Sequence, residues 1–129
     1  MNNTILVADD SPTELRLVLS ALGKKGYQTV TATDGEDAIE QARKHQPRLA
    51  ILDIIMPKKN GFQVTRALKT DAETSSMKVL LLSSKDQDSD KFWGMKQGAD
   101  EYLTKPFSPV RLLTIVEEML PQVSVWTPR

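Results

Sequence analysis

Three carboxylates and one ammonium stand where short apolar runs of this chain end. Asp9 and Asp10 close the first run, Asp53 closes the third, and Lys105 follows the fifth. Charge at the ends of buried strands is costly unless an ion of opposite sign is held there. Open α/β sheets also bind their ligands in the crevice outside the carboxyl ends of the strands. These four side chains are therefore candidates for a ligand-binding site.

The candidate site suits a metal ion and a phosphoryl group. The first and third strands are neighbours in doubly wound sheets of this kind, so the carboxylates of Asp9, Asp10 and Asp53 should converge. Two carboxylates about 4 Å apart repel by roughly 4 kcal/mol at an effective dielectric near 20. A cation is therefore required, and the all-oxygen ligand set favours Mg²⁺. A carboxylate beside Mg²⁺ can attack phosphorus to give an aspartyl phosphate, with Lys105 and the Ser83 hydroxyl on its oxygens.

Five short runs, rich in leucine or β-branched residues, alternate with amphipathic segments. The runs are Thr4–Ala8, Gln28–Ala32, Leu49–Asp53, Lys78–Ser83 and Glu101–Thr104. Almost unbroken apolar character, as in 79–82, is typical of strands covered on both faces. The pattern predicts an α/β fold with (βα)₅ topology, in which a doubly wound five-stranded parallel sheet has helices on both sides.

Cap and stop signals delimit five helices. Residues 11–14, Ser-Pro-Thr-Glu, match a capping box with proline at the first helical position, and Gly23 marks the end of that helix. The other helices are expected from Asp34 to before Pro47, from Gly61 to about Lys69, from Asp86 to Gln97 and from Ser108 to Pro121. The domain then covers residues 1–120, and 121–129, with Trp126, form a C-terminal tail or truncated linker.

The fourth predicted helix carries Phe92, Trp93 and Met95 within four positions. Large apolar residues at such spacing usually belong to the core, but these three cannot all face one side of a helix. We expect at least Trp93 to be exposed. An exposed tryptophan beside Tyr102 would suit a partner surface, and Met95 is a second candidate for it.

Composition excludes several classes of function. The chain has 129 residues, 17 Lys+Arg and 17 Asp+Glu, so its net charge is zero and it lacks the basic surface of a nucleic-acid-binding protein. It has no cysteine and one histidine, which excludes thiol chemistry and Cys- or His-rich metal sites. It has neither a signal-peptide pattern nor an apolar run of about 20 residues. The expectation is a cytoplasmic protein that binds neither nucleic acid nor membrane.

Taken together and in order, these motifs resemble receiver domains of two-component response regulators, among them the chemotaxis regulator CheY. The resemblance covers nearly the whole chain. It is carried by Asp9-Asp10, Asp53 followed by Met56-Pro57 and Gly61, Ser83-Ser84, Gly98-Ala99-Asp100 and residues 102–107. The stretches 62–66, 85–88 and 92–99 look most like regulators of twitching-motility chemosensory systems.

The resemblance implies a role for each site residue. Asp53 would be the phosphoacceptor, and Asp10, Asp53 and the backbone carbonyl of Ile55 would hold Mg²⁺, with Asp9 assisting. Lys105 would contact the phosphoryl group. The implied fold is flavodoxin-like and CheY-like, with strand order 2-1-3-4-5.

The resemblance also implies a switch and its partners. Ser83 and Tyr102 would be the coupled switch pair, and a cis peptide would precede Pro106. A histidine kinase would donate the phosphoryl group, and an unidentified protein target would bind the face formed by the fourth helix, fifth strand and fifth helix. The domain itself is expected to be a monomer or weak dimer, and a signalling module rather than an enzyme.

Three departures from the family pattern lie around the site. Ser83 replaces the commoner threonine, and Ser84 stands where alanine is usual. Ile55 is apolar where many relatives place a polar side chain, so it offers no help in positioning a hydrolytic water. We therefore expect a fairly long-lived phosphoryl group.

Other functions remain open at this point. The domain could drain phosphate from a kinase, bind partners without phosphorylation, or be the receiver fragment of a larger regulator. A Mg²⁺-dependent aspartyl phosphohydrolase is disfavoured, because such enzymes need a general acid near the nucleophile, where this chain has Ile55, and a substrate pocket often built by an inserted cap.

Overall fold

The computed structural model describes residues 3–120, which form a parallel sheet between two helical layers. The strands are β1 (Thr4–Ala8), β2 (Gln28–Ala32), β3 (Leu49–Asp53), β4 (Lys78–Ser83) and β5 (Glu101–Thr104). The helices are α1 (Pro12–Gly23), α2 (Gly35–His45), α3 (Gly61–Thr70), α4 (Asp88–Lys96) and α5 (Pro109–Met119). The strand order is β2-β1-β3-β4-β5, which confirms the predicted (βα)₅ fold and its strand order.

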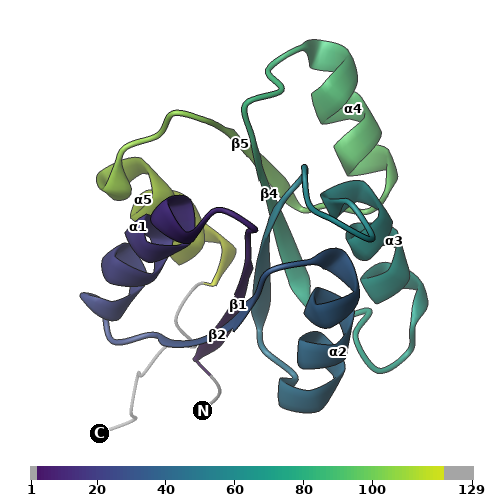
Figure 1. The fold of residues 1–129 in the computed structure, drawn as a ribbon, viewed down its shortest axis with the longest axis horizontal. Helices are drawn as coiled ribbons and strands as arrows, with labels where there is room; N and C mark the ends of the chain where they lie inside the picture. The colour runs from purple at the N-terminus through teal and green to yellow at the C-terminus, as the bar shows by residue number, and fades with distance from the viewer. Residues whose placement is uncertain (1–2, 121–129) are drawn as a thin grey trace, which may run out of the picture.

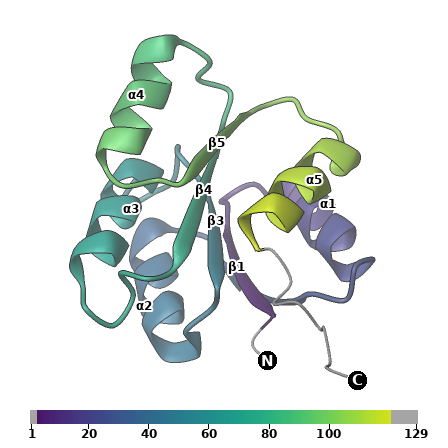
Figure 2. The same cartoon turned by 180° about the vertical axis from the view of Figure 1, so that it is seen from behind.

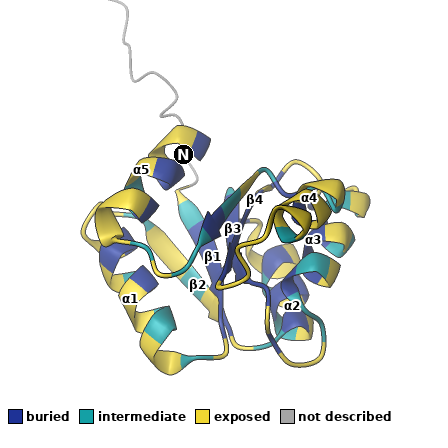
Figure 3. Ribbon diagram, turned by 90° about the horizontal axis from the view of Figure 1, so that it is seen from above, coloured by how far each residue is buried: buried dark blue, intermediate teal, exposed yellow. Residues whose placement is uncertain are grey.

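Each face of the sheet has its own apolar core. Helices α1 and α5 cover one face, and α2, α3 and α4 lie on the other (Figures 1 and 2). Successive strand side chains alternate between the two: Ile5 and Val7 pack with the α1/α5 cluster, whereas Leu6 and Ala8 pack with the opposite one. Figure 3 shows the inner strands β1, β3 and β4 buried between helices whose outer faces are exposed. This double burial explains why the inner strands β1, β3 and β4 read as almost unbroken apolar runs.

Parallel pairing brings the carboxyl ends of the strands to one edge of the sheet. The Asp9 amide donates to the Ala32 carbonyl at 3.1 Å as β1 ends, and the Lys105 amide donates to the Ser83 carbonyl at 2.8 Å as β5 ends. Asp53 is in register with Leu82 of β4. The predicted site residues therefore leave the sheet along one edge.

Two helix limits differ from the sequence-based expectation. Helix α4 spans Asp88–Lys96 and is shorter at both ends than the predicted segment 86–97. Gln87 is its N-cap and Gln97 its C-cap. Helix α3 continues to Thr70. Helix α5 ends at Met119 with Leu120 as its C-cap, just before the predicted stop at Pro121. The predicted tail 121–129, with Trp126, lies outside the described residues.

The loop between β3 and α3 rests on the start of α2. The Gly35 amide donates to the Pro57 carbonyl at 3.1 Å. A Cβ atom at Gly35 would overlap the Lys59 carbonyl. Gly35 thus allows a close backbone approach that positions the loop carrying Ile55.

Replacing Gly35 by alanine should destabilise the domain by about 1–3 kcal/mol, because the added methyl group meets backbone rather than a flexible side chain. Urea unfolding measures this change. Gly23→Ala is the matched control, since nothing lies within 4 Å of a Cβ there and alanine is the better helix former. Equal midpoints for wild type and Gly35→Ala would contradict the close approach.

Candidate functional site

Three carboxylates converge at the carboxyl edge of the sheet. One oxygen each from Asp9, Asp10 and Asp53 lies within 4.8 Å of the other two. Asp9 and Asp53 are buried, whereas Asp10 is exposed. The donor set is entirely carboxylate oxygen, which fits a hard divalent cation such as Mg²⁺. The structure thus brings together the three acids that the sequence predicted to converge.

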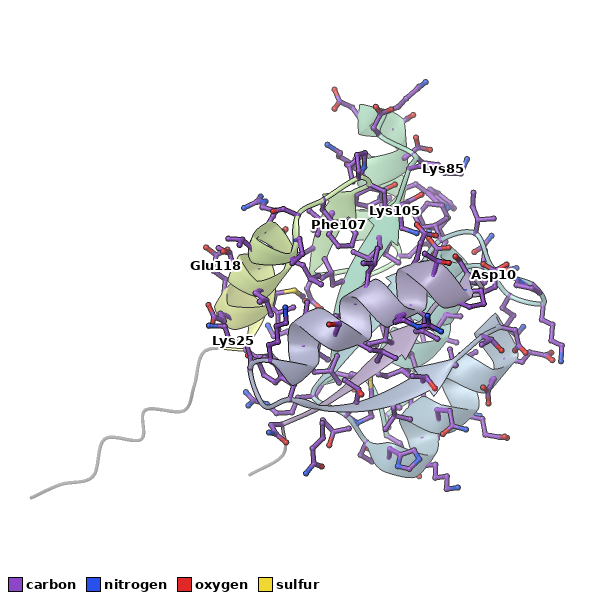
Figure 4. The ribbon with its side chains drawn as sticks, turned by 60° about the vertical axis from the view of Figure 1, so that its left-hand side comes forward. Asp10, Lys25, Lys85, Lys105, Phe107 and Glu118 are labelled. Carbon is purple, nitrogen blue, oxygen red and sulfur yellow. The ribbon has the colours of Figure 1, made fainter. Side chains whose placement is uncertain are left out.

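Lys105 joins this cluster from the end of β5. Its Nζ lies 2.8 Å from Glu14 Oε1, 3.1 Å from Asp53 Oδ1 and 3.5 Å from Asp9 Oδ2, and only 13% of its side chain is exposed. Figure 4 shows Lys105 and Asp10 at the same end of the molecule. The peptide bond before Pro106 is cis, as the resemblance implied.

Burial sets the protonation of the site without bound metal. It raises the pKa of Asp53 from 3.8 to about 6, opposed by the charge of Lys105 and reinforced by Asp9 and Glu14. Burial also raises the pKa of Asp9, against the lowering effect of a hydrogen bond from the Ser11 amide. For Lys105, burial lowers the pKa, but Glu14, Asp53 and Asp9 together raise it above its ordinary value. The ammonium is therefore retained beside carboxylates that are reluctant to ionise.

The raised pKa of Asp53 predicts the pH dependence of stability in metal-free buffer. Between about pH 4 and 6 the folded state holds the Asp53 proton more tightly than the unfolded state, so stability falls as pH rises through that window. The shift corresponds to a loss on the order of 3 kcal/mol. Asp53→Asn should reduce this slope, to which Asp9 also contributes, and be the more stable form at pH 7.5, as measured by urea unfolding across pH. Parallel pH profiles for the two proteins would contradict the assignment.

Of the two predicted switch residues, Ser83 is the last residue of β4 and Tyr102 lies in the neighbouring strand β5. Ser83 is buried, and its hydroxyl oxygen accepts from the Lys85 amide at 3.0 Å. Tyr102 is half-buried, and its hydroxyl donates to the Lys85 carbonyl at 2.7 Å. Burial raises the pKa of Tyr102, and a hydrogen bond with Ser83 opposes that shift. Both side chains thus engage the backbone of Lys85 in the loop before α4.

Ile55 lies in the loop after β3, one residue beyond the buried Ile54. Ile55 is 59% exposed and stands two residues after Asp53 in the sequence. That the Ile55 carbonyl binds the metal stays a prediction. The structure does show that the apolar side chain of Ile55 is exposed.

The expectation that Phe92 belongs to the core is wrong, whereas Met95, named as a candidate for a partner surface, is exposed. Phe92 and Met95 are 66% and 47% exposed, and Trp93, expected to be exposed, is 51% exposed. The reason is that α4 contacts the domain through Gly94, its one buried residue. A Cβ atom there would lie 2.9 Å from Leu81 and 3.3 Å from Tyr102. A helix that docks through a glycine leaves its large side chains outside.

Only one of the two hydrogen bonds of the predicted capping box at 11–14 is present. The Ser11 hydroxyl accepts from the Glu14 amide at 3.4 Å, as expected. The Ser11 amide, however, donates to Asp9 at 2.9 Å, and the Glu14 carboxylate is bonded to Lys105. Glu14 is therefore a site residue that sequence reasoning missed, because its spacing from Ser11 already had a local explanation.

The parallel sheet, the acidic cluster at its carboxyl edge and the adjacent lysine are the features of a receiver domain. The family model of the response regulator receiver domain matches residues 5–117, so this chain belongs to that family. Receiver domains are signalling switches that bind Mg²⁺ at an acidic pocket and accept phosphoryl groups from histidine kinases.

Two curated relatives come from Pseudomonas aeruginosa. Protein PilH is 46% identical over 90% of this chain and 96% of its own length. Protein PilG is 38% identical over 91% of this chain and 87% of its own. Among solved structures, the chemotaxis response regulator CheY4 of Vibrio cholerae is 30% identical, with a TM-score of 0.88 over 93% of this chain and all of CheY4. The resemblance to CheY-like response regulators is thereby confirmed.

Other curated relatives are transcriptional regulators, and this chain spans about half of their length. Within the described residues, no helix combines the length and apolar character needed to cross a membrane.

Proposed function

We propose that this domain is a phosphorylation-dependent switch that accepts a phosphoryl group from a histidine kinase on Asp53. The observation that carries the proposal is the placement of Asp53, with one oxygen 3.1 Å from the Lys105 ammonium and its carboxylate grouped with Asp9 and Asp10. An Asp53 oxygen attacks phosphorus, an O–P bond forms, and the P–N bond to the donor histidine breaks with its electron pair kept by nitrogen.

Each neighbour of Asp53 has a part in that transfer. Asp10, Asp53 and the Ile55 carbonyl would hold Mg²⁺, with Asp9 assisting, and the ion would neutralise charge that develops on the phosphoryl oxygens. Lys105 supplies a point charge to one of those oxygens. The Ser83 hydroxyl donates a hydrogen bond to a second phosphoryl oxygen after its own oxygen gives up the hydrogen bond from the Lys85 amide.

The output follows from the loop that Ser83 and Tyr102 share. A phosphoryl group adds about −1.5 to −2 charge and three acceptor oxygens. Drawing Ser83 toward it disturbs the loop at Lys85, to which Tyr102 is also bonded. The exposed Trp93 and Met95 on α4, with Tyr102 on β5, offer a surface that changes with the switch. We infer a protein target there, in a chemosensory or twitching-motility pathway, in line with the relatives PilH, PilG and CheY4.

Intact mass after incubation with acetyl phosphate and Mg²⁺ tests the proposal. We expect a gain of one phosphoryl group, its loss when the metal is chelated, and changed amide chemical shifts around residues 83–96. Failure to take up a phosphoryl group from either acetyl phosphate or a cognate kinase would leave a phosphorylation-independent binding module. Uptake without any change in shifts would favour a phosphate sink.

The exposed Ile55 predicts the lifetime of the phosphoryl group. Ile55→Asn should shorten the half-life of the phosphorylated domain by about 3- to 10-fold, because a polar side chain there can orient a water for attack on phosphorus. Decay of the phosphorylated mass after removal of the donor measures this. Ile55→Val, which stays apolar, is the control, and an unchanged half-life for Ile55→Asn would refute the idea.

A further inference from the structure

The Lys105 ammonium has no spare donor in the described structure. An ammonium has three N–H donors, and Lys105 Nζ lies within 3.5 Å of three carboxylates, those of Glu14, Asp53 and Asp9. Its shortest contact, 2.8 Å, is to Glu14 rather than to either buried acid. An additional acceptor at Lys105 therefore has to displace one of the three.

The three carboxylates differ in how readily they can be displaced. Asp53 would carry the phosphoryl group itself. Asp9 is 2% exposed and also accepts from the Ser11 amide at 2.9 Å, so it is fixed in place. The Glu14 side chain is 41% exposed and can exchange the ammonium for water. Glu14 is the partner whose release costs least.

We propose that Glu14 is a positioning residue that holds Lys105 in the unphosphorylated domain and gives it up to the phosphoryl group. This inference rests on the proposed function. Glu14 lies on the first turn of α1, at the rim of the acidic cluster, and its oxygen is at most about 6 Å from that of Asp53 through their shared ammonium. Its charge therefore favours a cation at the site and opposes an anionic phosphodonor.

The two effects have opposite signs, which separates this role from a structural one. Glu14→Gln should speed phosphorylation by subsaturating acetyl phosphate about 3- to 10-fold at saturating Mg²⁺, since a charge so close acts only partly screened. The same change should weaken Mg²⁺ binding by about 3-fold in calorimetric titration. A variant that merely loosened α1 would lower both quantities.

Two further variants test the contact itself. Glu14→Asp keeps the charge but withdraws the carboxylate by one methylene group, so it loosens the contact with Lys105 without removing the repulsion of an anionic donor. It should therefore speed phosphorylation, but less than Glu14→Gln does, while holding Mg²⁺ more nearly like wild type. Glu117→Gln removes the same charge from an exposed pair with Lys25, 3.9 Å apart, and should change neither quantity. Figure 4 shows Lys25 far along the molecule from Lys105.

The outcomes distinguish failure of the role of Glu14 from failure of the proposed function. A wild-type phosphorylation rate in Glu14→Gln, or in Glu14→Asp, would overturn the role of Glu14 while leaving the phosphorylation switch intact. If neither acetyl phosphate nor a cognate kinase phosphorylates the wild-type domain, the proposed function fails and the role of Glu14 fails with it. Faster phosphorylation in both Glu14 variants, with weaker Mg²⁺ binding in Glu14→Gln alone, is the result we expect.

Discussion

Asp53→Asn is expected to abolish phosphoryl uptake from acetyl phosphate, by a factor of at least about 10³. The amide lacks the negative charge that makes the Asp53 carboxylate a nucleophile, and it can no longer accept the full contact from Lys105 at 3.1 Å. The fold should survive, because asparagine has nearly the same shape and removes a buried charge whose pKa is already raised to about 6. Intact mass under saturating Mg²⁺ and acetyl phosphate measures the loss.

Two matched variants test whether the loss of phosphoryl uptake is specific to Asp53. Asp10→Asn should retain the phosphoacceptor but require more Mg²⁺, since it removes one carboxylate of the cluster. Asp71→Asn removes a carboxylate that pairs with Arg43 outside the cluster and should be phosphorylated like wild type. A phosphoryl group on the Asp53→Asn protein would show that another residue is the acceptor.

The strands and the acidic cluster were predictable because each strand is a short run of residues in the sequence, and the acids stand directly at the ends of two of these runs. All five strands begin and end where predicted. For the three inner strands the reason is that both faces are buried, which favours an almost unbroken apolar run. Asp9, Asp10 and Asp53 converge because parallel strands place their carboxyl ends at one edge. Neither inference needs knowledge of how side chains pack.

The errors arose where tertiary packing decides between local alternatives. The exposure of Phe92 depends on Gly94 meeting Leu81 and Tyr102, and an apolar pattern on one helix does not reveal this. Glu14 likewise satisfied a local capping rule but pairs with Lys105, 91 positions along the chain. Long-range ion pairs of this kind have no signature in sequence spacing.

Lys105→Met is expected to destabilise the metal-free domain by about 3–5 kcal/mol, and Mg²⁺ should restore most of that loss. Lys105 is the ammonium shared by Glu14, Asp53 and Asp9, two of which are buried acids. Methionine fills a similar volume but leaves those carboxylates without compensation. Urea unfolding at pH 7.5, with and without 10-fold excess Mg²⁺ over its dissociation constant, measures both effects.

The positive charge of Lys105 also predicts how the pH dependence of stability and the Mg²⁺ affinity change in Lys105→Met, and how a control variant behaves. The stability deficit of Lys105→Met should shrink as the pH falls from 7.5 to about 6, because Asp53 without the lysine holds its proton at a higher pH than in wild type and protonated Asp53 no longer needs a cation. Its Mg²⁺ affinity should exceed that of wild type, since a competing positive charge is gone. Lys25→Met, which breaks an exposed pair with Glu117, should cost less than about 1 kcal/mol. If Mg²⁺ stabilised Lys105→Met no more than wild type, the lysine would not be the charge that balances this pocket.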